Sequence, residues 1–201
     1  MKSSHKEKIH ELLNTQKPAF VQQGLELLKA VADNVEDVLK ILGVSELQEG
    51  KMPSLPSFCS QSSFIEIIAK LAPEWCESFH ALHIRCSKIP SEIERFINLE
   101  VLKIYGCGVE FVPSEIGNLN KLRVLNLANN NISAIPDSIG DLQSLEELSL
   151  ARNPIAIEGL PQSLGRLSKL KKLYVWFSNI ESKEALEHHL NNLSIVFFGW
   201  R

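Results

Sequence analysis

The sequence of 201 residues contains no apolar run of the roughly 20 residues needed to cross a bilayer. Its first twenty residues also lack the apolar core of a secretory signal. The four cysteines show neither the paired spacing of a disulfide framework nor the C-x-x-C spacing of a zinc site. From these absences we expect a cytoplasmic protein with reduced thiols and no membrane partner.

The chain also lacks a large net charge of either sign. The net charge of −3, from 21 basic and 24 acidic residues, provides no basic surface for nucleic acid. The chain also contains no glycine-rich loop with Lys, no H-E-x-x-H and no G-x-S-x-G. Proteins and peptides therefore remain as the expected partners, and we expect neither an enzyme nor a cofactor.

Three sets of side chains could still suggest catalytic or metal-binding chemistry. His80, His83 and Cys86 have ligand-like spacing, but residues three apart in a strand point to opposite faces, so we expect no metal there. Cys59 lies in a Ser-rich stretch without a neighbouring base. Cys86 and Cys107 fall in adjacent repeats, and a metal or redox switch at this pair is a third, minor hypothesis.

What the sequence does contain is an internal repeat. The frame L-x-x-L-x-L-x-x-N, numbered here as positions 1 to 9, recurs at intervals of 23 to 25 residues and starts at Leu99, Leu122, Leu145, Leu170 and, truncated, at Leu193. A unit of this size cannot bury its apolar face alone, so the units must stack into a solenoid. The alternation of Leu125 and Leu127 predicts a strand with one buried face.

In the cleanest copy the strand is followed by I-P-x-x-I-G-x-L at residues 135–142, and residues 112–119 repeat this motif with one substitution. The pattern resembles the leucine-rich repeat family, in its intracellular type of about 23 residues per unit. The resemblance covers residues 79–201 and implies an α/β solenoid with a concave parallel sheet and short convex helices or 3₁₀ turns. Asn130 and Asn153, at position 9, are predicted to bond buried backbone groups.

The first unit is degenerate. It is expected to begin at Phe79, which is three residues short of the usual spacing before Leu99. We place the deletion in the turn after Ser87.

The region before the repeats has a different composition. Helical spacing of apolar residues predicts a small all-α unit over residues 1–50, similar to helical segments that precede leucine-rich repeats in some bacterial proteins. We consider three alternative roles for this unit: a cover for the open end of the solenoid, a tethered helical module, or a recognition module for a partner. Residues 51–63, with two Pro and five Ser, predict a linker, and residues 64–78 a helix that caps the first coil.

Positions 3, 5, 7 and 8 of the frame project from the concave face. The candidate partner-binding residues are Lys103, Tyr105, Asn126, Asn129, Arg152, Tyr174, Trp176, Phe177, Phe197 and Trp200. Their aromatic members are concentrated in the last two units, where they either form a binding patch or close the end of the solenoid.

The sequence therefore predicts a non-catalytic module that binds a protein or peptide on its concave face. The alternative is a structural or regulatory spacer in a larger assembly, with specificity in the N-terminal helices. The sequence does not indicate an oligomeric state.

Overall fold

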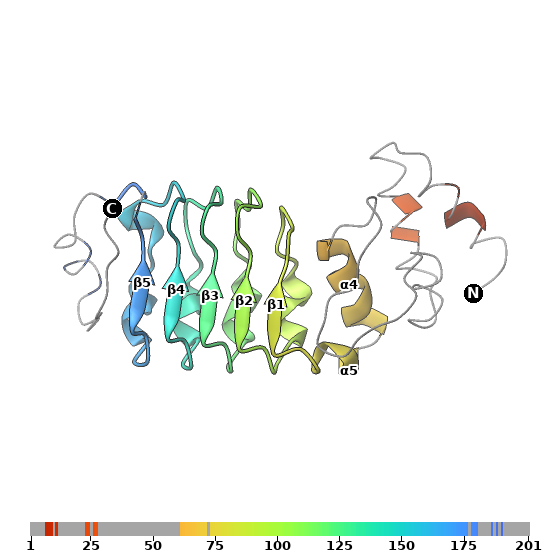
Figure 1. Ribbon diagram of the computed structural model, residues 1–201, viewed down its shortest axis with the longest axis horizontal. Coiled ribbons are helices and arrows are strands. Elements are labelled where there is room, and N and C mark those ends of the chain that lie inside the picture. Colours follow the sequence, from red (N-terminus) through yellow and green to blue (C-terminus); the bar gives the residue numbers. More distant parts are fainter. Residues whose placement is uncertain are drawn as a thin grey trace.

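The computed structural model describes residues 7–9, 11, 23–24, 26–27, 61–71, 73–176, 178–180, 186, 188 and 190. Within these residues the chain forms a solenoid with a five-stranded parallel sheet along one side, in the order β1-β2-β3-β4-β5 (Figure 1). The strands are β1 (Ala81–His83), β2 (Val101–Lys103), β3 (Val124–Asn126), β4 (Glu147–Ser149) and β5 (Lys172–Tyr174). None of the described helices is long and apolar enough to span a membrane.

The strand register confirms the repeat frame. Leu102 pairs with Leu125, and Leu125 in turn pairs with Leu148, so equal positions of successive repeats lie side by side. The degenerate first unit obeys the same register, because Leu82 pairs with Leu102. The five repeats are called coils 1 to 5 below, and they begin at Phe79, Leu99, Leu122, Leu145 and Leu170.

The convex side consists of 3₁₀ helices, as predicted. These are η1 (Ser91–Arg95), η2 (Ser114–Asn118), η3 (Asp137–Asp141), η4 (Ile157–Gly159) and η5 (Gln162–Arg166). A proline precedes each of them except η4, in an extended conformation that suits its fixed φ and removes no ladder donor.

The glycine of the I-G pair on the convex side allows adjacent 3₁₀ helices to pack closely. A Cβ atom added to Gly140 would lie 2.5 Å from the carbonyl oxygen of Ser163. The Ser163 hydroxyl in turn donates to the Asp137 carbonyl at 2.6 Å. The motif therefore encodes coil-to-coil contact as well as a turn.

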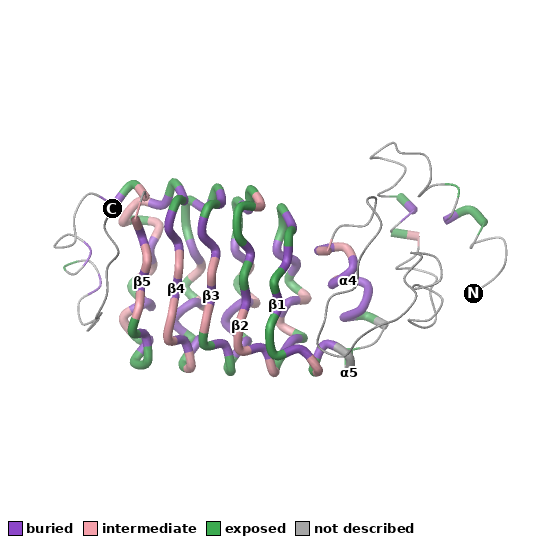
Figure 2. Tube along the Cα trace, viewed as in Figure 1, coloured by how far each residue is buried: buried purple, intermediate pink, exposed green. Residues whose placement is uncertain are grey.

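Buried residues recur along the strands and the 3₁₀ helices of successive coils (Figure 2), and they form one hydrophobic cluster. Leu125, Leu127, Ile132 and Ile139 of coil 3 are fully buried. Burial of such a side chain stabilises the fold by about 1.5–3 kcal/mol, and in each coil that burial depends on the neighbouring coils. The coils therefore stabilise one another.

The two irregular coils differ in their turns. Ile89 precedes the proline of η1 as Val112 precedes that of η2, so the three missing residues lie between Ser87 and Ile89, as predicted. The longer coil 4 accommodates its extra residues in η4, whose Gly159 carbonyl accepts a hydrogen bond from Ile135 at 3.0 Å.

The cap of coil 1 differs in detail from the prediction of one helix over 64–78. Helix α4 (Gln61–Leu71) begins earlier, so the last three residues of the predicted 51–63 linker are helical, and a second helix, α5 (Pro73–Cys76), follows. Proline disfavours a helical conformation in the residue before it, which explains the division. Helix α4 packs against η1, and the Gln61 side chain accepts a hydrogen bond from the Arg85 N–H.

The N-terminal unit predicted over 1–50 lies mostly outside the described residues. Residues 7–9, 11, 23–24 and 26–27 are helical, and Ile9 is buried. Residues 51–60 of the predicted linker also lie outside the described residues.

Candidate functional site

Seven of the ten candidate residues are described, and they lie on the sheet side of coils 2 to 5. Lys103, Asn126 and Tyr174 end strands β2, β3 and β5 in one register row, next to the buried leucines and pointing the opposite way. Phe177, Phe197 and Trp200 lie outside the described residues.

The row at position 7 of coils 2 to 5, called the position 7 row below, carries aromatic side chains at both ends and alanines between them. Tyr105 is 56% exposed at one end, Ala128 and Ala151 are buried in the middle, and the half-buried Trp176 lies at the other end. Because neighbouring strands are about 4.8 Å apart, the two aromatic residues are separated by about 14 Å, which is the length of about four extended residues. The position 7 row therefore has aromatic ends and small side chains in the middle.

Arg152 is held over the Trp176 end of the position 7 row. Its guanidinium carbon lies 5.1 Å from the centroid of the Trp176 ring, a cation–π distance. The Arg152 backbone has φ 56°, in the left-handed region that costs an ordinary residue about 1–2 kcal/mol. Gly106 and Asn129 occupy the same position 8 with φ values of 66° and 58°, and both residue types tolerate that conformation better than Arg. The strain at Arg152 marks this end of the face as a candidate site.

Position 9 is structural, as predicted. Asn130 Oδ1 accepts hydrogen bonds from the N–H groups of Cys107 and Val109, and Nδ2 donates to Ile104 at 2.7 Å and to Leu127 at 2.8 Å. Asn153 makes the equivalent bonds one coil further on. Both side chains are buried and are therefore not part of the candidate site.

Cys107 occupies position 9 of coil 2 and bonds less extensively. Its Sγ lies 3.2 Å from the Tyr105 carbonyl and 3.8 Å from the Ile84 carbonyl of coil 1. A thiol is a weak donor, and it lacks the amide oxygen through which Asn130 accepts from the preceding coil. Coils 1 and 2 are consequently joined less firmly here than coils 2 and 3.

The backbone ladder shows the same weakness. At position 8 the N–H of Gly106, Asn129 and Arg152 donates to position 7 of the next coil, at 3.2, 2.8 and 2.9 Å. Among the described residues, the equivalent bond from Cys86 N–H to the Tyr105 carbonyl is missing. Cys86 also lacks the positive φ of the other position 8 residues.

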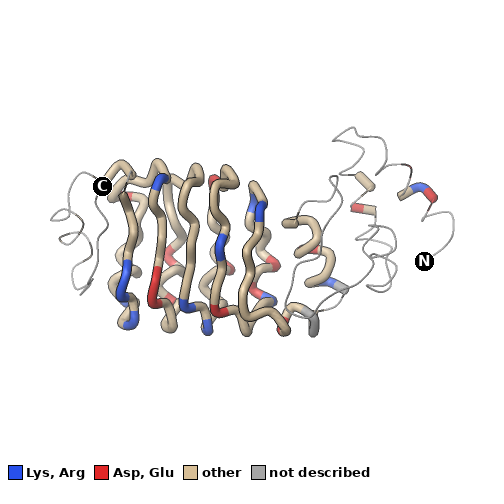
Figure 3. The backbone as a smooth tube through the Cα atoms, in the orientation of Figure 1, with Lys and Arg blue, Asp and Glu red and all other residues tan. Residues whose placement is uncertain are grey.

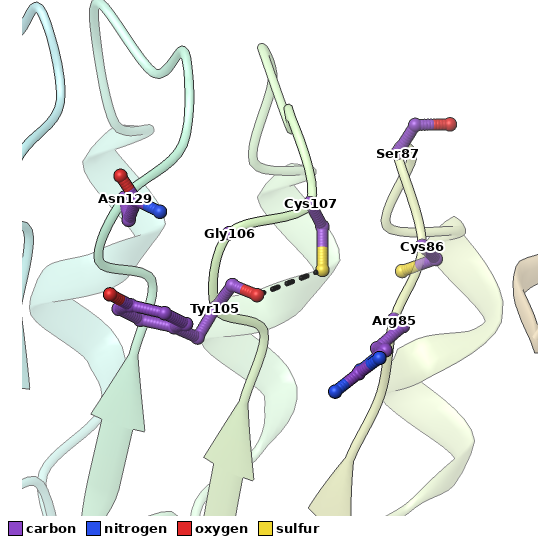
Figure 4. Close-up of a pocket in the computed structure, with 7 residues that line it drawn as sticks. All are labelled: Arg85, Cys86, Ser87, Tyr105, Gly106, Cys107 and Asn129. Atoms are coloured by element: carbon purple, nitrogen blue, oxygen red, sulfur yellow. Dashed lines mark hydrogen bonds between the residues drawn. The ribbon is translucent and has the colours of Figure 1, made fainter.

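A pocket of about 510 Å³ opens where this bond is missing (Figure 4). This notch, as it is called below, is lined by Arg85, Cys86, Ser87, Tyr105, Gly106, Cys107 and Asn129. Arg85 leans from coil 1 towards coil 2, and Tyr105 leans from coil 2 towards coil 3. The candidate residues predicted from the sequence do not include Arg85. The available signal was the three-residue deletion after Ser87, which indicates that the turns of coils 1 and 2 differ at this point.

The cysteines of the notch are free thiols. Burial, together with the charge that Cys107 would carry, raises the pKa of the Cys86 thiol to about 12. Cys86 therefore remains protonated and unreactive at neutral pH. His80 and His83 are exposed, and no cluster of three or more His, Cys, Asp or Glu occurs among the described side chains.

A second group of charged residues lies at one end of the strands and is structural. Position 2 of successive coils carries alternating charges, Glu100, Arg123, Glu146 and Lys171 (Figure 3). Glu146 lies 2.9 Å from Arg123 Nε and 2.7 Å from Lys171 Nζ. Hydrogen bonds from these two side chains lower the pKa of Glu146 to about 2. The charges of this row neutralise one another and leave little for a ligand.

The comparison with protein families agrees with this architecture. A family model described as leucine-rich repeat region matches residues 80–196, more than half of the chain. The chain therefore belongs to the leucine-rich repeat family. No curated protein matches it.

Several solved structures are similar to this chain. An internalin from Listeria monocytogenes is similar over 68% of this chain and 43% of its own, with 20% identity and a TM-score of 0.50. PEPR1-AtPEP1 is 27% identical over 60% of this chain and 18% of its own, with a TM-score of 0.48. The ectodomain of the Arabidopsis thaliana receptor kinase GASSHO1/SCHENGEN3, in complex with CASPARIAN STRIP INTEGRITY FACTOR 2, is 21% identical over 70% of this chain and 17% of its own, with a TM-score of 0.48. This chain spans less than half the length of each of these structures.

Proposed function

We propose that the chain is a non-catalytic interaction module whose concave face binds an extended segment of a partner protein. The observation that carries the proposal is the position 7 row, with aromatic ends at Tyr105 and Trp176 and the small side chains of Ala128 and Ala151 between them. Aromatic side chains supply much contact area at little entropic cost, and the alanines leave room for a peptide backbone.

Polar groups border the position 7 row. Lys103 is exposed and Asn126 half-buried at the ends of their strands, and Asn129 is exposed at position 8. They offer donors and acceptors to the main chain of a bound segment, which would fix its direction. Their backbone is held by the buried ladder of Asn130 and Asn153, so little order needs to be gained on binding.

The C-terminal aromatics take part in this proposal as binding groups. Tyr174 and Trp176 are both half-buried, and Arg152 stacks on the ring of Trp176. A ring that is already held in place by a stacked cation loses little freedom on binding. The cytoplasmic location and the spacer alternative remain predictions of the sequence.

The test is capture of partners by the tagged full chain, followed by mass spectrometry. Combined Tyr105→Ala and Trp176→Ala is expected to abolish capture while the melting temperature changes little. The matched control is Ile97→Ala, which truncates a 48% exposed side chain outside the concave columns and should leave capture intact.

Two outcomes contradict the proposal. If the double variant loses about 3–5 kcal/mol of stability, the aromatics close the solenoid instead of binding. If it still captures the partner, but a chain without residues 1–60 does not, the N-terminal helices carry the specificity and the repeats act as a spacer.

A further inference from the structure

The concave face has a charge opposite to that of the whole chain. The described residues at positions 3, 5, 7 and 8 include Arg85, Lys103, Arg152 and Lys172 but only one acidic residue, Glu147. The complete sequence, in contrast, has a net charge of −3. The acidic residues are therefore distributed away from the surface on which a partner is proposed to lie.

Two of these four positive charges, at coils 1 and 2, have no ion-pair partner among the described residues. Lys172 pairs with Glu147 across β4 and β5, and Arg152 stacks on Trp176. Within the described part of the chain, Arg85 and Lys103 make no ion pair. The contrast with the paired charges at position 2 is marked, because each of the four side chains there has an oppositely charged neighbour.

Arg85 stands at the mouth of the notch on a fixed backbone. Its N–H donates to the Gln61 side chain of helix α4, and its neighbour Cys86 is buried. The guanidinium leans towards coil 2, whereas the exposed ring of Tyr105 leans on towards coil 3, with its hydroxyl on the side away from Arg85 (Figure 4). Asn129 adds an amide, whose nitrogen would lie 3.2 Å from a Cβ atom on Gly106.

We propose that the notch between coils 1 and 2 binds an acidic side chain, Asp or Glu, of the segment that lies on the concave face, with Arg85 as its main partner. The inference rests on the proposed function and names the chemistry of the bound segment. A guanidinium presents parallel N–H donors that match the two oxygens of one carboxylate. Lys103, exposed at the end of β2, attracts acidic residues nearby.

The thiols of the notch are compatible with an anion. The Cys86 thiol stays protonated because of its raised pKa, so it adds no negative charge. A phosphate group shares the anionic chemistry, but only one cation lines the notch, and one guanidinium matches a single carboxylate charge better than a dianion. We therefore assign the site to a carboxylate and make phosphate an outcome of the test.

The experiment is selection of a displayed library of random peptides on the full chain, repeated with Arg85→Glu. The wild type is expected to enrich peptides with Asp or Glu at one position, and Arg85→Glu to replace that preference by Lys or Arg. The matched control is Arg95→Glu, an exposed arginine on the convex η1, which should select the same peptides as the wild type. Selection without acidic enrichment, or acidic enrichment that survives Arg85→Glu, would overturn the inference.

A selected peptide then allows a double-mutant cycle. Replacement of its acidic residue by the neutral amide, or Arg85→Ala in the protein, should each weaken binding about tenfold, and both together no further. Arg85→Lys should retain an intermediate affinity. The inference is overturned if the effects of the two changes on binding are additive. It is also overturned if inorganic phosphate at low millimolar concentration displaces the peptide.

The same peptide separates this inference from the proposed function. If Tyr105→Ala with Trp176→Ala weakens binding but Arg85→Ala does not, the concave face binds and the notch is not its acidic subsite. If neither change affects binding, the proposed function itself is wrong.

Discussion

The side-chain oxygen of Asn130, in coil 3, accepts a hydrogen bond from the backbone N–H of Cys107, in coil 2, at 3.0 Å. Through this contact one side chain closes the turn of the preceding coil and joins two repeats. Coil 2 carries Cys107 at the same position and cannot do this for coil 1, because a thiol has no comparable acceptor. The notch opens between coils 1 and 2.

Asn130→Ala is expected to lower the free energy of unfolding by about 1–3 kcal/mol, because it leaves buried backbone groups without partners. Asn129→Gly is the matched change, since Asn129 is exposed and glycine accepts its positive φ. Denaturant unfolding of both variants checks this. Equal unfolding free energies would contradict the structural role of position 9.

Gly140→Ala is expected to destabilise the solenoid by about 1–3 kcal/mol, because its Cβ would lie 2.5 Å from the backbone oxygen of Ser163 and the 3₁₀ helices would have to separate. At Gly165, the equivalent position in coil 4, the nearest atom would be the Leu190 oxygen at 3.4 Å, so Gly165→Ala should be close to neutral. Thermal unfolding measures both. A Gly140→Ala variant as stable as the wild type would show that the coils do not pack through this glycine.

Leu125→Ala removes a fully buried side chain at the centre of β3 and should cost about 2–5 kcal/mol. Val124→Ala, the adjacent change on the outward face of the same strand, should cost much less, because Val124 is only partly buried. Chemical denaturation of the two variants checks the strand register. A reversed order of stability would mean that the register is shifted by one residue.

The Glu146 carboxyl should contribute to the dependence of stability on pH. Its pKa is lowered in the folded state from 4.5 to about 2 by Lys171 and Arg123, so its contribution is complete above about pH 4.5 and is lost as the pH falls towards 2. Glu146→Gln should flatten the fall in melting temperature over this interval, and the effect should be small because the ion pairs are exposed to solvent. An unchanged pH profile would show that the row of charges does not couple to folding.

The repeat itself predicted most of the fold correctly. Strand position, parallel stacking, convex 3₁₀ turns and the roles of Asn130 and Asn153 all follow from a pattern that each unit carries locally. The place of the deletion in coil 1 was also predicted, because the apolar positions before Pro90 and Pro113 correspond. The start of α4 was wrong by a few residues, since Ser-rich composition does not prevent the first turn of a helix.

The candidate site was predicted only in part, because it depends on distances between coils. Composition indicated no electrostatic preference, but folding gathers Arg85 and Lys103 on one face and pairs Arg123 with Glu146 elsewhere. Nor did the spacing of residues show that Arg152 stacks on Trp176. Periodicity within one repeat places a side chain on a face of the solenoid. How far neighbouring turns separate, and which charges remain unpaired, follows from packing between repeats, where one missing hydrogen bond opens the notch beside Cys86.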